Sequence, residues 1–225
     1  MLDLDAWLES CLQALKAAFG DRLWFVGLQG SRGRGEATEN SDIDTVVILD
    51  ALTKEDIAAY GAVLDTLEHR DLVCGFLSGR AELLCWEPSD LFQFCHDTTP
   101  ILGSLDTILA KVDADAVDRA VRMGACNLYH GCVHNLLFER DEKALPGLYK
   151  AAAFVIRALV FRQTGRFCRR LDELSDHAGE EEKKIIAAYV QMTHGGAGDF
   201  QGLSESLFGW AQRIITLPTY VRNTF

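Results

Sequence analysis

Hydrophobic and polar residues alternate with helical spacing at the start of the chain. The apolar positions recur every three or four residues, at Leu4, Trp7, Leu8, Cys11, Leu12 and Leu15. This pattern predicts an amphipathic helix that begins after Asp3 or Asp5 and ends at Gly20. Two later segments, Leu23–Leu28 and Ile43–Leu49, are instead short continuous apolar runs, which are typical of buried strands.

A second helix is expected after Thr53. Thr53 and Asp56 resemble a capping box, and apolar residues then share one helical face at Ile57, Tyr60, Leu64 and Leu67. The run Leu72–Leu77 predicts a third strand. The stretch Ala81–Phe94, which Pro88 interrupts, stays open between helix and strand.

Long helical patterns replace strands after about Asp115. They cover Val117–Phe138, Leu148–Gln163, Glu180–Thr193 and Leu203–Ile215. We therefore predict an α+β protein, with a short mixed sheet flanked by helices in residues 1–110 and a helical bundle in residues 111–225. A Gly-Ser pair and an acidic stretch mark the boundary. We expect an active site between the two domains, because ligands favour such interfaces.

Composition limits the class of protein. The 225 residues carry a formal net charge of −11, which argues against a nucleic-acid backbone as the main ligand. No apolar run approaches the roughly 20 residues of a membrane span, and the N-terminus lacks the positive charge of a signal peptide. Seven scattered cysteines, without a CxxC pair, indicate reduced core thiols. These features predict a cytoplasmic protein without a membrane partner.

One segment carries most of the chemistry. It runs from Gly30-Ser31 through Gly35 to Ser41-Asp42-Ile43-Asp44. Glycines after a strand permit a sharp turn, and free N–H groups at the start of a helix can bind phosphate oxygens. Asp42 and Asp44 stand two apart at the start of a strand, so both carboxylates should emerge on one face. A shared Mg²⁺ would remove their mutual repulsion, with substrate phosphates completing its coordination.

A purely structural turn is the alternative, in which Ser41 and Asp42 only satisfy backbone groups. The combined register of glycines, serines and aspartates makes that alternative the weaker one. Basic residues that could contact phosphate form two clusters. One contains Arg32 and Arg34, and the other contains Arg157, Arg162, Arg166, Arg169 and Arg170.

The segment resembles the GS-x-x-x-G-x(n)-SDxD signature of the DNA polymerase β-like nucleotidyltransferase superfamily, particularly the kanamycin nucleotidyltransferase and minimal nucleotidyltransferase types. The C-terminal half resembles their helical, HEPN-like domain. The resemblance implies that Gly30 and Ser31 hold the β- and γ-phosphates while Asp42 and Asp44 coordinate one or two Mg²⁺ ions. The expected reaction moves a nucleoside monophosphate, most simply AMP from ATP, onto a hydroxyl of an aminoglycoside-like molecule or a protein, and releases pyrophosphate.

The other basic residues of the site are less constrained by the resemblance. Arg32 and Arg34 either touch phosphate or solvate the loop. Lys150 matches a lysine that helps to bind the nucleotide in the kanamycin nucleotidyltransferase type. The glutamate expected one turn earlier as a base is replaced by Pro146, so Glu142 would have to substitute for it.

The superfamily also uses a third carboxylate from the next strand, and here that position falls on Cys74. The displaced candidates are Asp71, Glu82 and Glu87. This departure keeps a competing hypothesis open, a nucleotide-binding regulatory protein without turnover. A ribonuclease activity of the C-terminal half is disfavoured, because Arg122 and His130 are spaced too widely for that motif. The sequence leaves a homodimer open and does not identify the acceptor.

Overall fold

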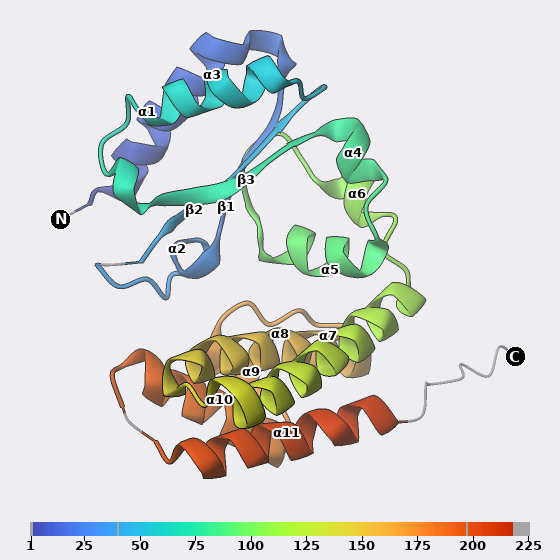
Figure 1. Ribbon diagram of the computed structural model, residues 1–225. Coiled ribbons are helices and arrows are strands. Elements are labelled where there is room, and N and C mark those ends of the chain that lie inside the picture. The colour runs from blue at the N-terminus through green and yellow to red at the C-terminus, as the bar shows by residue number, and fades with distance from the viewer. Residues whose placement is uncertain (1, 40, 197, 218–225) are drawn as a thin grey trace, which may run out of the picture. The chain divides into compact units, whose positions relative to one another are not determined.

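The computed structural model describes residues 2–39, 41–196 and 198–217 of the chain (Figure 1). The chain divides into two compact units, Met1–Val112 and Asp113–Phe225. The first unit contains a four-stranded sheet with helices, and the second is helical. The predicted α+β class is therefore confirmed.

The N-terminal unit is built on a mixed sheet in the order β3-β2-β1-β4. Strands β1 (Leu23–Gln29) and β2 (Ile43–Leu49) are antiparallel, β3 (Val73–Gly79) runs parallel to β2, and β4 (Thr99–Leu102) is antiparallel to β1. The helices are α1 (Leu4–Phe19), α2 (Gly30–Arg34), α3 (Lys54–Leu64), α4 (Arg80–Leu84), α5 (Pro88–Asp97) and α6 (Asp106–Leu109). Short 3₁₀ turns at Gly20–Arg22 and Arg70–Leu72 precede β1 and β3.

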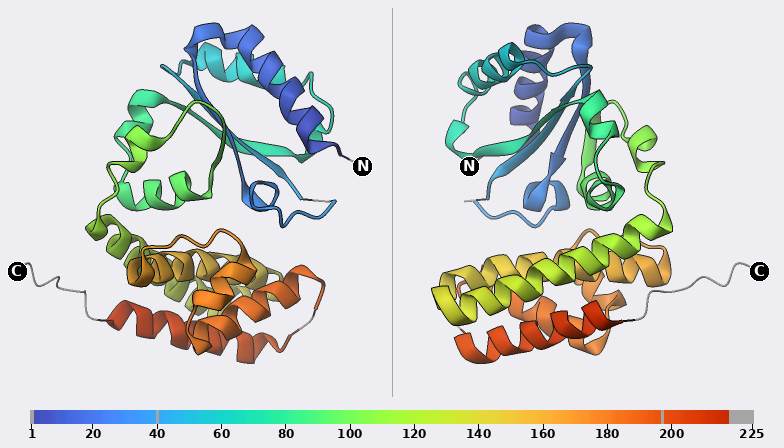
Figure 2. Two further views of the ribbon diagram at one scale, coloured as in Figure 1. Left: turned by 180° about the vertical axis from the view of Figure 1, so that it is seen from behind. Right: turned by 45° about the vertical axis from the view of Figure 1, so that its right-hand side comes forward.

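Helices cover both faces of this sheet (Figure 2). Alternate residues of β2 point to opposite faces. Ile43 and Val47 belong to the core formed with α1 and α3, whereas Val46 and Ile48 belong to the core formed with α4, α5 and α6. Burial on both faces explains why the predicted strands read as continuous apolar runs.

Helix boundaries follow the local capping chemistry. Asp3 caps α1 by accepting a hydrogen bond from the Ala6 N–H at 3.2 Å. Both hydrogen bonds of the predicted capping box between Thr53 and Asp56 are present at the start of α3. Pro88 lies in the first turn of α5, where its missing N–H costs nothing, so the ambiguous stretch consists of two short helices.

The C-terminal unit is a helical bundle, as predicted. It contains α7 (Ala114–His134), α8 (Leu145–Thr164), α9 (Leu171–His177), α10 (Glu180–Thr193) and α11 (Phe200–Thr216). A π-helical segment, Asn135–Glu139, continues α7, and a 3₁₀ turn, Glu142–Ala144, precedes α8. Helix α8 packs against α7, α10 and α11 and is the most buried helix of the bundle.

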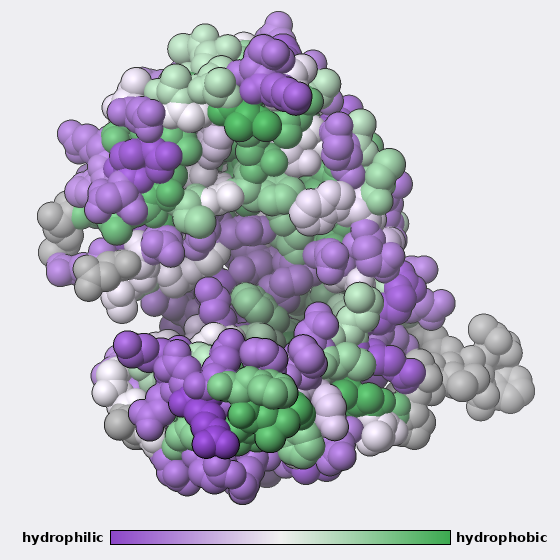
Figure 3. Space-filling model, viewed as in Figure 1, coloured by the Kyte–Doolittle hydropathy of each residue, from purple (hydrophilic) through white to green (hydrophobic). Residues whose placement is uncertain are grey.

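One expectation needs correction, because a segment of this bundle does reach the length and hydropathy of a membrane span. The segment Glu142–Thr164 has 23 residues, and an 18-residue window within it has a mean hydropathy of 1.5. However, 56% of its apolar window is buried inside the protein. On the side shown in Figure 3, hydrophilic side chains cover most of the C-terminal unit around smaller hydrophobic patches. The hydropathy of α8 is therefore that of a core helix.

The cysteine prediction was only partly right. Four of the seven thiols are buried, at Cys11, Cys95, Cys132 and Cys168. Three are exposed, at Cys74, Cys85 and Cys126. Their positions explain this exposure: Cys74 lies on the edge strand β3, Cys85 in the loop after α4, and Cys126 on the outer face of α7.

Candidate active site

The glycine turn and the aspartates of the motif meet at the ends of β1 and β2. Gln29, the last residue of β1, pairs with Asp44 in the antiparallel ladder. The next residue, Gly30, has φ +70 and begins α2. A β-carbon on Gly30 would overlap with the Asp44 carboxylate, whose Cγ would lie only 2.8 Å away. Only glycine therefore allows this turn and Asp44 to lie together.

The two aspartates flank a fully buried residue. Ile43 between them has no exposed surface, whereas Asp42 is exposed and Asp44 is half-buried. The turn before them is fixed by Ser41, whose Oγ accepts a hydrogen bond from the Thr38 N–H at 2.9 Å. Two carboxylates two positions apart are thus presented beside a glycine turn.

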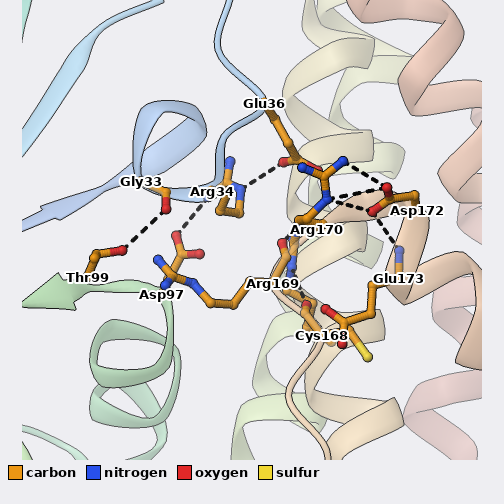
Figure 4. A network of polar contacts seen from close by, with 11 residues as sticks. Gly33, Arg34, Glu36, Asp97, Thr99, Cys168, Arg169, Arg170, Asp172 and Glu173 are labelled. Atoms are coloured by element: carbon orange, nitrogen blue, oxygen red, sulfur yellow. Dashed lines mark hydrogen bonds and ion pairs between the residues drawn. The ribbon is translucent and has the colours of Figure 1, made fainter. Parts of the chain in front are cut away.

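The arginines of the motif hold this loop in place. Arg32 donates to the carbonyl oxygen of Ser41 from Nε at 3.1 Å and from Nη2 at 2.7 Å. Arg34 donates from Nε to Glu36 at 3.0 Å and from Nη1 to Asp97 at 2.8 Å (Figure 4). The Arg34 side chain is only 8% exposed, so it does not solvate the loop.

Burial opposes the charge of Arg34, but the neighbouring Asp97 and Glu36 carboxylates outweigh it and raise the Arg34 pKa. The guanidinium therefore stays charged. Sequence reasoning found Arg34 but missed Asp97, because their contact joins α2 to the end of α5.

Two more side chains join the loop to the junction of α5 and β4. The Gln29 amide nitrogen donates to the Phe94 carbonyl at 3.1 Å and lies 2.7 Å from the Thr98 hydroxyl. The Thr99 hydroxyl donates to the Gly33 carbonyl at 3.2 Å (Figure 4). The glycine turn is consequently anchored from a segment that follows it by more than sixty residues.

The third carboxylate position carries a thiol. The parallel register of β2 and β3 places Cys74 beside Asp44, in agreement with the prediction for this position. The three displaced acidic candidates lie outside β3: Asp71 in the preceding 3₁₀ turn, Glu82 in α4 and Glu87 at the N-cap of α5. Among the described residues, no group of three or more His, Cys, Asp or Glu side chains is arranged to hold a metal ion.

The C-terminal residues singled out by the sequence lie at the start of α8. Lys150 is exposed in the second turn of this helix, and Glu142 is exposed in the preceding 3₁₀ turn. Pro146 occupies the first helical turn, which begins at Leu145 rather than at Leu148.

The second arginine cluster contacts groups of its own unit. Arg157 is buried and donates to the carbonyls of Cys168 and Arg169. Three members of the cluster form ion pairs: Arg162 with Asp118, Arg166 with Glu173, and Arg170 with Asp172. Figure 4 shows the last of these. The Arg162–Asp118 pair joins α8 to α7, and the other contacts stabilise the α8–α9 connection. The expectation of phosphate contact had not included these partners.

A cavity of about 450 Å³ opens beside the motif loop. Its lining consists of Leu2, Arg32, Ala37, Thr38, Glu39, His69 and Leu72. Neither Gly30 and Ser31 nor the aspartate pair contributes to it. We therefore build the site on the aspartates and not on this cavity.

Comparisons with known proteins give one family match and one shared fold. Residues 8–88 match the family model of the nucleotidyltransferase domain. No curated protein gives a sequence match. Among the solved structures that match is the spectinomycin adenyltransferase AAD(9) from Enterococcus faecialis, crystallised with ATP and spectinomycin. The TM-score is 0.61 at 14% identity, over 93% of this chain and 98% of that chain, which shows a shared fold.

The HEPN likeness of the C-terminal unit stays a prediction. The family match covers the glycine turn, the aspartate pair and β3. Residues 8–88 therefore form a nucleotidyltransferase domain, and the chain as a whole shares the fold of the solved structure described above.

Proposed function

We propose that the enzyme transfers AMP from ATP to a hydroxyl group of an aminoglycoside-like small molecule or a protein, and releases pyrophosphate. The observation that carries this proposal is the contact between the Gly30 turn and the Asp44 carboxylate. It joins a loop suited to phosphates to a residue suited to a cation. The structural neighbour solved with ATP and spectinomycin supports the choice of donor and of acceptor class.

Magnesium fits the residues present. Mg²⁺ is usually bound by one or two carboxylates, with waters and substrate phosphates as further ligands. Asp42 is exposed and Asp44 is half-buried on either side of Ile43, so both can contribute carboxylate oxygens. When bound, the ion would neutralise charge on the phosphates and favour departure of pyrophosphate.

The chain's own residues then take separate roles. Gly30 and Ser31 would bind the β- and γ-phosphates through backbone N–H groups and the serine hydroxyl. Arg32 and Arg34 would keep the loop in shape, in line with their contacts to Ser41, Glu36 and Asp97. Lys150 would contact the nucleotide from the C-terminal unit.

The transfer exchanges two bonds at the α-phosphorus. The acceptor oxygen forms a bond to it, and the bond to the oxygen that bridges to the β-phosphate breaks. The strand neighbours of Asp44 are Gln29 and Cys74, and neither carries a carboxylate that could take the hydroxyl proton. We propose Glu142 as that base, and the C-terminal unit as the part that selects the acceptor.

Labelled ATP tests this function directly. The protein, Mg²⁺ and ATP labelled at the α-phosphate would be incubated with spectinomycin, with other aminoglycosides or with cell extract. We expect a labelled acceptor, and its loss in Asp44→Asn. Asp50→Asn is the matched control, because Asp50 is an exposed acid directly after the same strand. Retained transfer in Asp44→Asn would contradict the assigned role.

The regulatory alternative is favoured by one observation, the thiol at the position beside Asp44. It predicts binding of Mg-ATP without a labelled product in any acceptor panel. Equilibrium dialysis with labelled ATP separates the two functions, since the enzyme must show both binding and transfer. We further propose a cytoplasmic location, where ATP is present and thiols stay reduced.

A further inference from the structure

A buried hydroxyl lies next to Asp44 on β2. Thr45 is 1% exposed, and its Oγ1 lies 3.1 Å from the Tyr60 hydroxyl of α3 and 3.3 Å from the Cys74 carbonyl oxygen of β3. A buried hydroxyl costs free energy unless it is hydrogen-bonded. The two contacts satisfy it in a strand that is otherwise apolar from Val46 to Leu49.

The direction of these hydrogen bonds follows from their chemistry. A carbonyl oxygen can only accept, so the Thr45 hydroxyl donates its proton to Cys74. The Thr45 oxygen then accepts from the Tyr60 hydroxyl. Burial raises the Tyr60 pKa, so that hydroxyl stays protonated and able to donate at neutral pH. The result is a chain of two hydrogen bonds from α3 through β2 to β3.

The backbone of β3 is also pressed against Thr45. Gly75 has φ +155, and a β-carbon there would overlap with the Thr45 carbonyl oxygen and lie 2.7 Å from Oγ1. Both Cys74 and Gly75 thus contact the residue that follows Asp44. Cys74 lies beside Asp44 in the parallel register, so these contacts act where β3 borders the aspartate pair.

We propose that Thr45, held by Tyr60, is a positioning residue that sets the separation of β2 and β3 at Asp44 and Cys74. It acts from the opposite face of the sheet and touches no substrate. In this way it fixes the Asp44 carboxylate against the glycine turn and holds Cys74 of β3 beside it. The inference rests on the proposed function of Asp44.

Thr45→Val tests the proposal, because valine keeps the shape of threonine and removes its hydroxyl. We expect kcat to fall about tenfold with KM for ATP within about twofold, since misplacement by about 1 Å can cost a hundredfold. Thr45→Ser should restore the rate. Thr66→Val is the matched control, because it removes a similar hydroxyl-to-carbonyl bond at the end of α3.

A second readout does not depend on activity. In a background with Cys85→Ser and Cys126→Ser, the rate at which Cys74 reacts with a thiol reagent should change in Thr45→Val and not in Thr66→Val. Unchanged kcat and unchanged Cys74 reactivity in Thr45→Val would overturn the proposal. If wild-type protein transfers no label, the proposed function fails, while Cys74 reactivity still decides whether Thr45 positions β3.

Discussion

Removal of Arg34 should destabilise the N-terminal unit, because this side chain joins the glycine turn to the end of α5. Its side chain is 8% exposed and contacts the Asp97 carboxylate, whose side chain is 9% exposed, at 2.8 Å. Removing one partner of a buried ion pair is strongly destabilising and costs about 3–5 kcal/mol. For Arg34→Met we expect about 3 kcal/mol, the lower end of that range, because the second partner, Glu36, is 19% exposed and can regain water.

Thermal unfolding followed by tryptophan fluorescence measures this loss. Three of the four tryptophans, Trp7, Trp24 and Trp86, lie in the N-terminal unit. At about 4 °C per kcal/mol for a domain of roughly this size, the midpoint should fall by about 12 °C. The control is Arg170→Met, whose ion pair with Asp172 is more than half exposed on both sides and should contribute little to stability. Equal, small shifts in the two variants would refute the reasoning.

Three further outcomes are expected. Gly30→Ala should abolish transfer, because the new β-carbon would displace the carboxylate behind it, whereas Gly61→Ala, with open space around it, should keep activity and gain about 0.5–1 kcal/mol of stability. The hydrogen bond from Arg22 holds the pKa of Asp56 well below its usual value, so the pair stabilises the fold above about pH 4 and loses this effect as pH falls through the lowered pKa. Urea midpoints of wild type and Asp56→Asn should therefore converge in strong acid, and a constant gap would contradict this. At about pH 8, Ellman's reagent should titrate three thiols in the folded protein and seven in urea, since burial raises the pKa of the other four. If more than three thiols of the folded protein reacted rapidly with the reagent, the buried cysteines would be accessible.

Strong local patterns explain which parts of the fold could be predicted. The strand Ile43–Leu49 was predicted with its observed bounds, because every residue from Val46 to Leu49 packs into one of two cores. The capping box of α3 involves residues only three apart, so its signal is complete within the sequence. The same holds for the motif, whose two halves are joined by a short loop.

Short elements and distant contacts were not predicted. Strand β4 has four residues, and α2 and α4 have five each. Elements this short do not display a recognisable periodicity of hydrophobic residues. The partner of Arg34, Asp97, lies 63 residues away in the sequence. The sequence around a charged residue does not indicate which distant residue will pair with it. The phosphate role considered for Arg34 was a fair inference from residue type, since only the fold reveals the carboxylates around it.

The high hydropathy of α8 has a practical consequence for handling the protein. Helices α7, α10 and α11 cover α8, and they precede and follow it in the sequence. A truncation that removes any of these helices would uncover a surface that is apolar enough to aggregate or to insert into lipid. Expression of the bundle alone should therefore start no later than Asp113 and retain the whole of α11.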